Sequence, residues 1–360
     1  MDRIAQIKGM RSFLLDIYEL CDYNKEKGVS ALGKCKTQAA TNPYKHSDTN
    51  KRYYTYDYFL KSTFGGKVAK LPLDAGFTCP NIDGRCAHGG CIYCSDKGSG
   101  DFAPQPSVPI SEQLEMSRAL IGKKWQTDKV IPYFQAHTNT YAPIEVLRQK
   151  YEQALAYPGV VGLNIATRAD CLEPDVLAYH SEISRRTYLT VELGLQSSND
   201  KTSVLINRGH DYEAFVKGYN ALQSANKDIH ICIHVILGLP GEDESTMLQT
   251  VRDVAALRPD QVKLHLLHVI KDTVMADMYL RGDYTPMNMP DYVRTVAKAL
   301  TLLPPDTVIA RLTGDGAPDA LLAPDWSRKK TIVINEIDKF MYQNDLYQGK
   351  YYNTEEDHVC

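Results

Sequence analysis

The sequence has no long apolar run, no strong excess of one charge and no visible internal repeat. None of its stretches approaches the roughly 18 consecutive apolar residues that identify a membrane-spanning helix. The formal net charge of −3 argues against a general nucleic-acid binder. The N-terminal stretch has acidic residues within its apolar part and no small-residue cleavage site, which argues against a secretory signal. We therefore expect a cytoplasmic protein with no membrane association.

Cysteine usage and the distribution of charge narrow the class further. The nine cysteines are an odd number with one cluster, which fits a reducing compartment better than a disulfide framework. Residues 1–70 hold 13 Lys/Arg and 7 Asp/Glu, a balance of +6, so the remaining residues carry −9. We expect residues 1–50 to form a basic N-terminal extension and linker, and an anionic partner for this part stays open.

Short β-branched runs alternate with helical segments from about residue 67 onward. This alternation predicts successive βα units that build a parallel sheet. The predicted strands lie near 67–74, 129–135, 160–166, 188–196, 229–237 and 261–267. The predicted helices between them lie near 111–123, 144–156, 174–184, 211–225 and 244–257.

The two faces of the predicted strands distinguish a barrel from an open sheet. A strand that helices cover on both sides is nearly continuously apolar. In the fifth strand, however, isoleucines share one face while His230 and His234 share the other. In the sixth strand, Lys263 and His265 lie opposite valine and leucine in the same way. One apolar and one polar face favour helices outside and a polar cavity inside, where these four side chains could contact a substrate.

We therefore predict the α/β class, with a partial (β/α)6 TIM-like barrel over residues 51–270. Residues 271–345 contain two further helical segments and an apolar run at 308–312, and would form a short α/β cap packed on the barrel. Residues 346–360 are polar, and we expect a loose tail there.

Three cysteines in the stretch LDAGFTCPNIDGRCAHGGCIYCSDKGSGDFAP are the most informative feature of the chain. Eleven residues separate Cys79 from Cys91, and two separate Cys91 from Cys94. Thiolates gathered among glycines at the end of a strand are suited to hold a metal, and three ligands leave it one open position. The loop follows the first predicted strand at its carboxyl end, where barrel enzymes carry their chemistry. The position favours a catalytic centre.

Two other interpretations of these cysteines stay open. Zinc prefers four thiolate or imidazole ligands, and Cys86 within the loop could supply the fourth. The chain would then be a zinc-stabilised nucleic-acid-binding module without radical chemistry. Alternatively, an iron–sulfur cluster in this loop could serve only to carry electrons.

Several stretches between about residues 52 and 315 carry a family resemblance. They are GFTCPN, GGCIYCS, YFQAHTNTYAP, IATRADCL, VELGLQSSND, INRGHD, HVILGLPGE and VKLHLLHVIKDT. Together they resemble the radical S-adenosylmethionine (SAM) enzymes, in an uncharacterised branch related to the catalytic subunit of Elongator. That branch expands the usual first cysteine gap to eleven residues, as this chain does.

The resemblance implies a partial barrel of the radical SAM type with a 4Fe–4S cluster held by Cys79, Cys91 and Cys94. The fourth iron would bind SAM, and a one-electron reductant of the flavodoxin or ferredoxin type would deliver the electron. Cleavage of SAM would give methionine and a 5′-deoxyadenosyl radical that takes hydrogen from the substrate. Cys86 matches no ligand position of the family, so the resemblance makes it a bystander.

The resemblance also implies which side chains would contact SAM. The expected contacts are Tyr93, Gln135, Asn139, Arg168, Glu192, Gln196, Arg208, Leu237 and Gly238. The tyrosine and the Leu-Gly pair would border the adenine, and the arginines would bind the SAM carboxylate. Glu192 or Gln196 would hold the ribose hydroxyls or the amino group. Many relatives carry a glycine-rich segment at the end of the second strand. This chain lacks that segment, and Gln135 and Asn139 would take its place. An internal ion pair between Glu192 and Arg168 is the structural alternative.

The substrate is not readable from these motifs. The related Elongator subunit acts on the tRNA wobble uridine, and the basic N-terminal part of this chain is compatible with RNA, so tRNA is a candidate partner by analogy. The portion after the barrel is too short for an acetyl-coenzyme A-binding domain. A metabolite or a peptide is the alternative, and the lack of a second cysteine-rich cluster argues against peptide maturation.

Overall fold

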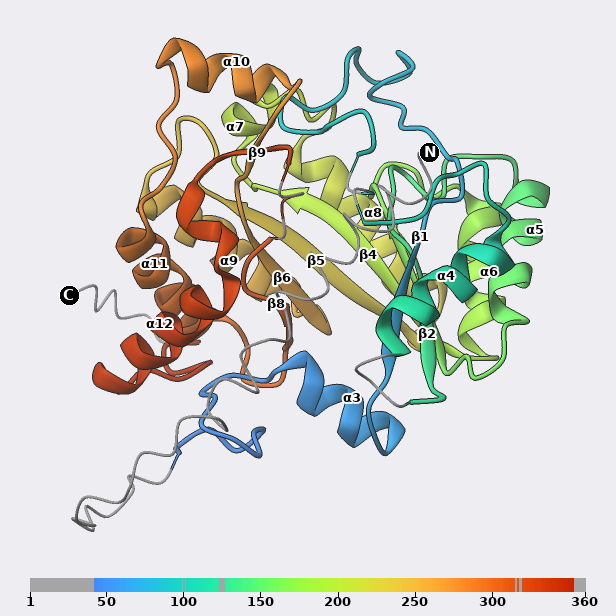
Figure 1. Cartoon of the computed structure of the whole chain (residues 1–360), viewed down its shortest axis with the longest axis horizontal. Helices are drawn as coiled ribbons and strands as arrows, with labels where there is room; N and C mark the ends of the chain where they lie inside the picture. The colour runs from blue at the N-terminus through green and yellow to red at the C-terminus, as the bar shows by residue number, and fades with distance from the viewer. Residues whose placement is uncertain are drawn as a thin grey trace.

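Seven parallel strands form one sheet that curls into an open half-barrel (Figure 1). The structure is a computed structural model that describes residues 42–98, 100, 102–122, 127–314, 316 and 319–352. The spatial order is β1 (Ala69–Leu73), β2 (Val130–Phe134), β3 (Gly162–Thr167), β4 (Tyr188–Gln196), β5 (Ile229–Leu237), β6 (Gln261–Leu266) and β8 (Val308–Arg311). The two edges of this order are β1 and β8, so the barrel is open between them.

Helices connect the strands and cover the outer face of the sheet (Figure 1). In chain order they are α3 (Tyr56–Phe64), α4 (Ile110–Gly122), α5 (Ile144–Leu155), α6 (Pro174–Ser184), α7 (Asp200–Leu205), α8 (Tyr212–Ala225), α9 (Glu244–Leu257), α10 (Val274–Arg281), α11 (Met289–Leu302) and α12 (Lys330–Gln343). A short 3-10 helix, η2 (Asp325–Arg328), and an antiparallel pair, β7 (Val269–Ile270) with β9 (Leu321–Ala323), complete the fold. Within the described residues, every helix is too short or too polar to cross a bilayer.

Local sequence explains where the helices begin. The side chain of Asp211 accepts a hydrogen bond from the backbone N–H of Ala214 at the start of α8. Asp243 does the same for Thr246 at the start of α9. Each aspartate satisfies a backbone donor that the first helical turn would otherwise leave without a partner.

The apolar faces of the strands build the main core beneath these helices. Val191 and Leu193 of β4 and Ile231 and Ile233 of β5 are buried in one apolar cluster with Phe215 of α8. The residues that alternate with them point into the half-barrel. The predicted division into an apolar outer face and a polar inner face is therefore confirmed, and with it the partial barrel.

The barrel has one more strand than the six predicted. The apolar run at 308–312, expected within the cap, contains β8, which pairs with β6 in parallel, with Val262 opposite Ile309. The sequence predicted this run as part of the cap, whereas its pairing with β6 makes it a strand of the sheet. It therefore extends the sheet instead of covering it.

The structure also corrects the expected tail. Gln348 is completely buried, and its side chain donates hydrogen bonds to the carbonyls of Pro304 and Thr307. Residues 346–352 are thus packed on the domain, whereas 353–360 lie outside the described residues. Most of the predicted extension over 1–50 also lies outside them. Within its described part, Tyr44 is buried and donates its hydroxyl to the carbonyl of Pro305.

A buried histidine on α6 gives a prediction about acid stability. His180 is completely buried near Tyr151, and neither ring nitrogen has a hydrogen-bond partner among the described residues. Burial lowers the pKa of His180 to about 4. Between about pH 6.5 and pH 4, this histidine binds a proton in the unfolded chain but not in the folded chain. The free energy of unfolding therefore falls as the pH drops from about 6.5 towards 4.

We expect His180→Leu to remove this part of the pH dependence. Between pH 7 and pH 5 the wild type should lose about 2 kcal/mol of unfolding free energy more than the variant does. Urea unfolding of both proteins at the two pH values measures the difference. Parallel changes in the two proteins would contradict the assignment.

Candidate active site

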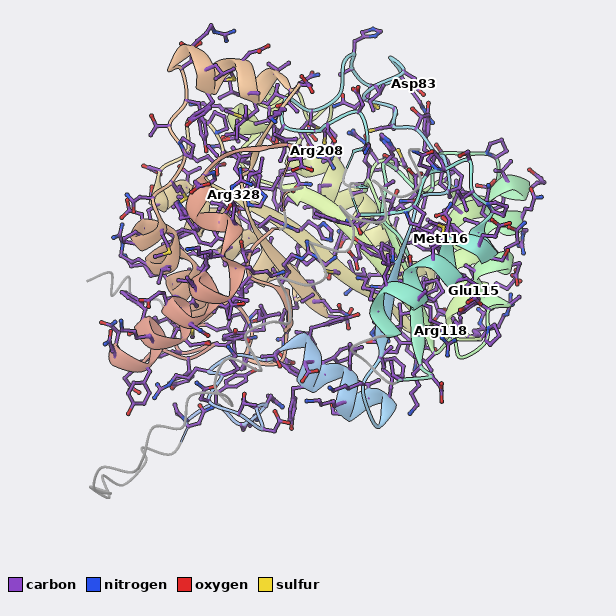
Figure 2. All side chains as sticks on the ribbon, viewed as in Figure 1. Asp83, Glu115, Met116, Arg118, Arg208 and Arg328 are labelled. Atoms are coloured by element: carbon purple, nitrogen blue, oxygen red, sulfur yellow. The ribbon has the colours of Figure 1, made fainter. Side chains whose placement is uncertain are left out.

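A cavity of about 270 Å³ lies at the carboxyl ends of the strands and is lined by Cys79, Cys91 and Cys94. We call it the cysteine cavity. Tyr93, between the last two cysteines, also lines it. The structure therefore brings the three predicted ligands together at the end of the half-barrel where barrel enzymes place their chemistry. Figure 2 shows Arg208 of this cavity and Asp83 of the cysteine loop at the same end of the molecule, away from Arg118 of α4.

Backbone turns hold both ends of the cysteine loop. The carbonyl of Cys79 accepts hydrogen bonds from the N–H groups of Ile82 and Asp83, at 2.8 and 3.2 Å. The carbonyl of Cys91 accepts one from the N–H of Cys94 at 3.0 Å. These turns orient the thiols without a disulfide, and all three cysteines are free.

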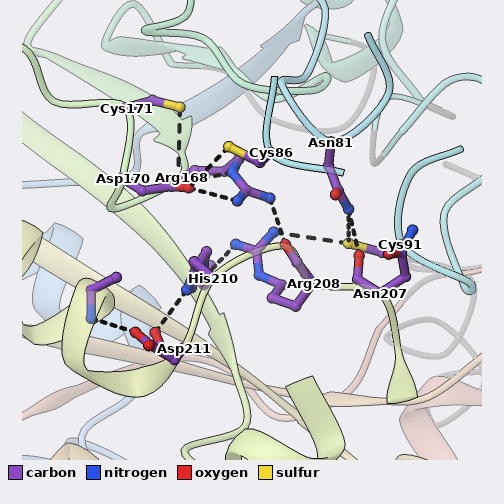
Figure 3. A network of polar contacts seen from close by, with 12 residues as sticks. Asn81, Cys86, Cys91, Arg168, Asp170, Cys171, Asn207, Arg208, His210 and Asp211 are labelled. Carbon is purple, nitrogen blue, oxygen red and sulfur yellow. Dashed lines mark hydrogen bonds and ion pairs between the residues drawn. The ribbon is translucent and has the colours of Figure 1, made fainter. Parts of the chain in front are cut away.

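Two asparagines fasten this loop to the segment between α7 and α8 (Figure 3). Asn81, which is completely buried, donates its side-chain N–H groups to the sulfur of Cys91 at 3.4 Å and to the carbonyl of Asn207 at 2.5 Å. Asn207 in turn donates to the carbonyls of His88 and Gly90, at 2.8 and 2.7 Å. The hydrogen bonds thus position Cys91 from two separate stretches of chain.

Two arginines place positive charge beside the cysteines (Figure 3). The Nη1 atom of Arg208 lies 3.9 Å from the sulfur of Cys91. Arg168 donates its Nη1 N–H to the carbonyl of Arg208 at 2.8 Å and binds Asp170 through Nε and Nη2, at 2.8 and 2.7 Å. A hydrogen bond shared with Cys94, followed by the charges of the arginines, holds the pKa of the Cys91 thiol well below its usual range. The same hydrogen bond, followed by burial, raises the pKa of the Cys94 thiol well above its usual range. Of this pair, the arrangement therefore favours the thiolate at Cys91, and the thiolate is the form that binds metal.

Cys86 lies apart from the other three cysteines of the loop. It is exposed, is absent from the lining of the cysteine cavity, and its sulfur lies 3.7 Å from a carboxylate oxygen of Asp170. Although the residue as a whole is exposed, partial burial of its thiol, followed by the adjacent Asp170 charge, raises the pKa of Cys86. Both observations argue against a four-cysteine zinc site that includes Cys86.

Glu192 of β4 lies at the centre of a buried polar cluster rather than at a free cofactor contact. Its Oε1 accepts hydrogen bonds from Lys70 at 2.6 Å and from Asn164 at 2.8 Å. Its Oε2 accepts from three further groups: the Tyr133 hydroxyl at 2.8 Å, His234 Nε2 at 2.8 Å and Lys263. A carboxylate offers about four acceptor sites, so these five donors saturate it. Contact of Glu192 with the SAM ribose or amino group stays a prediction, and such a contact would have to displace one of these donors.

The structural alternative for Glu192, an ion pair with Arg168, is wrong, because Arg168 pairs with Asp170. Burial disfavours the charged carboxylate, but the ammonium groups of Lys263 and Lys70 hold the pKa of Glu192 well below its usual range. Glu192 thus positions two lysines on the inner wall of the barrel.

Gln135, Gln196 and Arg208, three of the residues predicted to contact SAM, line the cysteine cavity. Gln196 has a positive φ of 74°, at the point where the register between β4 and β5 shifts. Two residues earlier, a Cβ atom at Gly194 would lie 2.7 Å from Gln196 Nε2 and 3.1 Å from Arg208 Nη2. Glycine at this position therefore lets the arginine reach the Gly194 carbonyl, to which it donates.

Asn139 and His230 lie outside the cysteine cavity. Asn139 is completely buried and donates to the carbonyls of Phe134 and Ala166, at 3.1 and 2.8 Å, so it joins the ends of β2 and β3. His230 stacks on Tyr188 with ring centroids 3.9 Å apart, near the amino end of β5. Both residues have partners within the protein, and their cofactor or substrate contacts stay a prediction.

Leu237 and Gly238 also point away from the cavity. Leu237 is fully buried in the core under the outer helices, and its neighbour Ile236 lines the cavity instead. The Gly238 carbonyl accepts a hydrogen bond from the Tyr284 hydroxyl at 2.7 Å. The alternation along β5 predicts this outcome, because Leu237 continues the apolar face. Neither residue lines the cysteine cavity, and the adenine contacts expected at both stay a prediction.

Three partners of Glu192 were not identified from the sequence: Lys70, Tyr133 and Asn164. Lys70 and Pro72 alternate with Ala69, Leu71 and Leu73 in β1, so the face of Lys70 was readable. Its partner was not, because Glu192 follows 122 residues later in the chain. His234, Lys263 and His265 do face the cysteine cavity, as their alternation predicted.

Comparison with protein families places the chain among known enzymes. The chain matches the radical SAM superfamily over residues 81–254 and the radical SAM C-terminal domain over residues 259–343. It is 45% identical over 316 residues to the uncharacterized protein YtqA of Bacillus subtilis, covering 88% of this chain and 98% of that protein. It is 35% identical over 286 residues to protein YhcC of Escherichia coli K12, covering 79% of this chain and 91% of that protein.

More distant matches point to Elongator. The chain is 26% identical over 159 residues to the tRNA uridine(34) acetyltransferase of Methanocaldococcus jannaschii, covering 43% of this chain and 28% of that protein. The fold resembles that of archaeal Methanocaldococcus infernus Elp3, with a TM-score of 0.60, 19% identity, and coverage of 78% of this chain and 64% of that one. The chain therefore belongs to the radical SAM superfamily, whose enzymes use a 4Fe–4S cluster and SAM, in a branch related to Elongator.

Proposed function

We propose that Cys79, Cys91 and Cys94 hold the 4Fe–4S cluster and that the enzyme acts on a nucleoside of tRNA. The observation that carries the ligand assignment is that these three thiols line one cavity, which Cys86 does not. When bound, the cluster and SAM supply a 5′-deoxyadenosyl radical that removes hydrogen from the substrate. The positive charge of the cavity supports binding of a cluster held by thiolates. Among the described residues that line this cavity, four are lysine or arginine and Glu192 is the one acidic side chain.

The chain's own residues would bind SAM and exclude water. Tyr93, Gln135 and Gln196 line the cavity with groups suited to an adenine or ribose, and Arg208 is placed for the SAM carboxylate. Arg168 is engaged by Asp170 and by the Arg208 carbonyl, so its proposed role is to position Arg208. The charges of both guanidiniums would stabilise the thiolates and the anionic cofactor.

The assignment to tRNA is supported by the match to the tRNA uridine(34) acetyltransferase. The enzyme class needs a one-electron reductant, and we propose a flavodoxin or ferredoxin for it. A nucleoside profile of tRNA from a strain that lacks this gene tests the substrate. We expect one modified uridine to disappear and its precursor to accumulate. An unchanged profile would exclude tRNA as the substrate and would favour a metabolite.

Asn81 gives a prediction about the surroundings of the proposed cluster. Asn81→Leu keeps the number of side-chain heavy atoms and removes the donor to the Cys91 sulfur, together with the hydrogen bond to the Asn207 carbonyl. Groups that hydrogen-bond to metal ligands affect metal affinity by about 10- to 100-fold, so we expect iron retention against a chelator to weaken by about tenfold. Asn220→Leu, an exposed change on α8, is the matched control. Equal iron loss in both variants and the wild type would contradict this role.

A further inference from the structure

A second cavity, of about 650 Å³, lies at the opening of the half-barrel between β1 and β8. We call it the seam cavity. Residues of α3, α4 and α12 complete its lining. It shares five lining residues with the cysteine cavity: Phe102, Tyr133, Gln135, Lys263 and Arg311. The two cavities are therefore adjacent across one wall, and a molecule in the seam cavity would face the proposed radical site.

The lining of the seam cavity combines apolar surface with positive charge. Apolar and aromatic side chains such as Tyr56, Leu60, Ile121 and Ile309 form much of it. Five lysine or arginine side chains and two aspartates also line it, and one of these acids, Asp57, is already paired with a lysine on its own helix. The volume and character are those of a site for a small organic molecule.

Two of these cations share one carboxylate. Lys70 and Lys263 both donate to Glu192, and their side chains are only 22% and 6% exposed. The Lys70 Nζ atom also lies 3.7 Å from the centre of the Tyr133 ring. One carboxylate balances one of the two ammonium groups, so a surplus positive charge lies at the wall between the cavities whenever both lysines are protonated. A surplus charge in a buried position is unfavourable until an anion reaches it.

Lys70 also has donors to spare. An ammonium group has three N–H donors. Glu192 is the one hydrogen-bond acceptor that Lys70 reaches among the described residues, although Lys70 lines the seam cavity. Burial lowers the pKa of Lys70 to about 7 in spite of the adjacent Glu192, which agrees with an incompletely compensated charge.

The same cluster is unsuited to a metal cation. Glu192, Cys232 and His234 have ligand atoms within 4.8 Å of one another. However, Lys70 and Lys263 both contact the only carboxylate of this group, and a cation would have to displace them. The charge of the cluster favours an anion.

We propose that Lys70 and Lys263 anchor an anionic group of the substrate in the seam cavity: a phosphate if the substrate is tRNA, and a carboxylate or phosphate if it is a metabolite. The rest of the substrate then extends across the shared wall towards the cysteine cavity, and Glu192 holds both lysines in place. This inference rests on the proposed function for the identity of the ligand as substrate. The anion site itself depends only on the residues present.

Small aromatic probes test the site in the full chain. We would measure binding of benzoate, phenyl phosphate and neutral benzamide by calorimetry and by saturation-transfer NMR. Wild type should bind at least one of the two anions and bind benzamide at least about tenfold more weakly, as one hydrogen bond to a charged group predicts. The anion that binds more tightly identifies the substrate group as carboxylate or phosphate.

Variants locate the binding. Lys70→Met leaves Glu192 paired with Lys263, so the fold should persist, and anion binding should weaken at least about tenfold while benzamide is unaffected. Lys70→Arg should retain most of it. Lys217→Met, an exposed change on α8, is the control and should behave as wild type. Unchanged anion binding by Lys70→Met would overturn the proposal.

Two outcomes keep the inferences separate. Equal binding of benzamide and the anions by wild type overturns the anion site even if Lys70→Met does not fold. SAM cleavage by the reconstituted wild type is measured in parallel. Protein that cleaves SAM but does not distinguish anions contradicts only the anion site, whereas protein that binds anions through Lys70 but does not cleave SAM contradicts only the proposed function.

Discussion

Replacing Cys94 by alanine is expected to abolish cluster binding and SAM cleavage, whereas replacing Cys86 by alanine should leave both largely intact. Cys94 lines the cavity with Cys79 and Cys91, and its loss leaves two thiolates for a cluster that needs three. Cys86 is exposed and lies next to Asp170 instead. The two variants remove the same chemical group from the same loop, so they are matched.

Iron and sulfide content after anaerobic reconstitution measures the first effect. Formation of 5′-deoxyadenosine from SAM in the presence of dithionite measures the second. The cluster content of the Cys94 variant should fall to background, and that of the Cys86 variant should match wild type. An equal loss of iron in both variants would show that Cys86 is a ligand and that the three-cysteine assignment is wrong.

Glu192→Gln is expected to destabilise the fold strongly. The substitution keeps the shape of the side chain but leaves the buried ammonium group of Lys263, and that of Lys70 when it is protonated, without an anionic partner. Removing one partner of a buried ion pair costs about 3–5 kcal/mol. Urea unfolding should show this loss, or the protein should fail to accumulate in soluble form. Glu213→Gln, an exposed change on α8, should stay within about 0.5 kcal/mol of wild type.

A double variant tests whether the loss comes from the lysines. Glu192→Gln combined with Lys263→Met removes one of the stranded charges, so it should be more stable than Glu192→Gln alone. A coupling of this sign would be expected only if the two side chains interact directly. If Glu192→Gln costs less than about 1 kcal/mol, the carboxylate does not balance the lysines and the anion site loses its support.

The architecture could be predicted because its signal is local. The polar inner face of β5 and β6, with His234 and Lys263, requires only the alternation of neighbouring residues, and it correctly favours a barrel over an open sheet. The seventh strand was not predicted because β8 has four residues and its pairing with β6 is visible only in three dimensions.

The sequence predicted which face of its strand each site residue occupies, but not which side chains it would bind. Glu192 was correctly placed on the inner wall, yet its role depends on Lys70 from β1 and Lys263 from β6, which are distant in sequence. Arg168 was placed correctly at the end of β3, but Asp170 two residues later is its partner. The resemblance assigned Leu237 to the cofactor, whereas its position in the alternation predicted the apolar core, in which its side chain is buried.

The central claim is that three protein thiolates hold a four-iron cluster and leave one iron open to SAM. Mössbauer spectroscopy of protein reconstituted with the isotope iron-57, recorded with and without SAM, tests it most directly. The account predicts that one iron site in four changes its spectrum when SAM is added and that the other three do not. Four equivalent sites that do not respond to SAM, or a protein that retains zinc instead of iron, would contradict it.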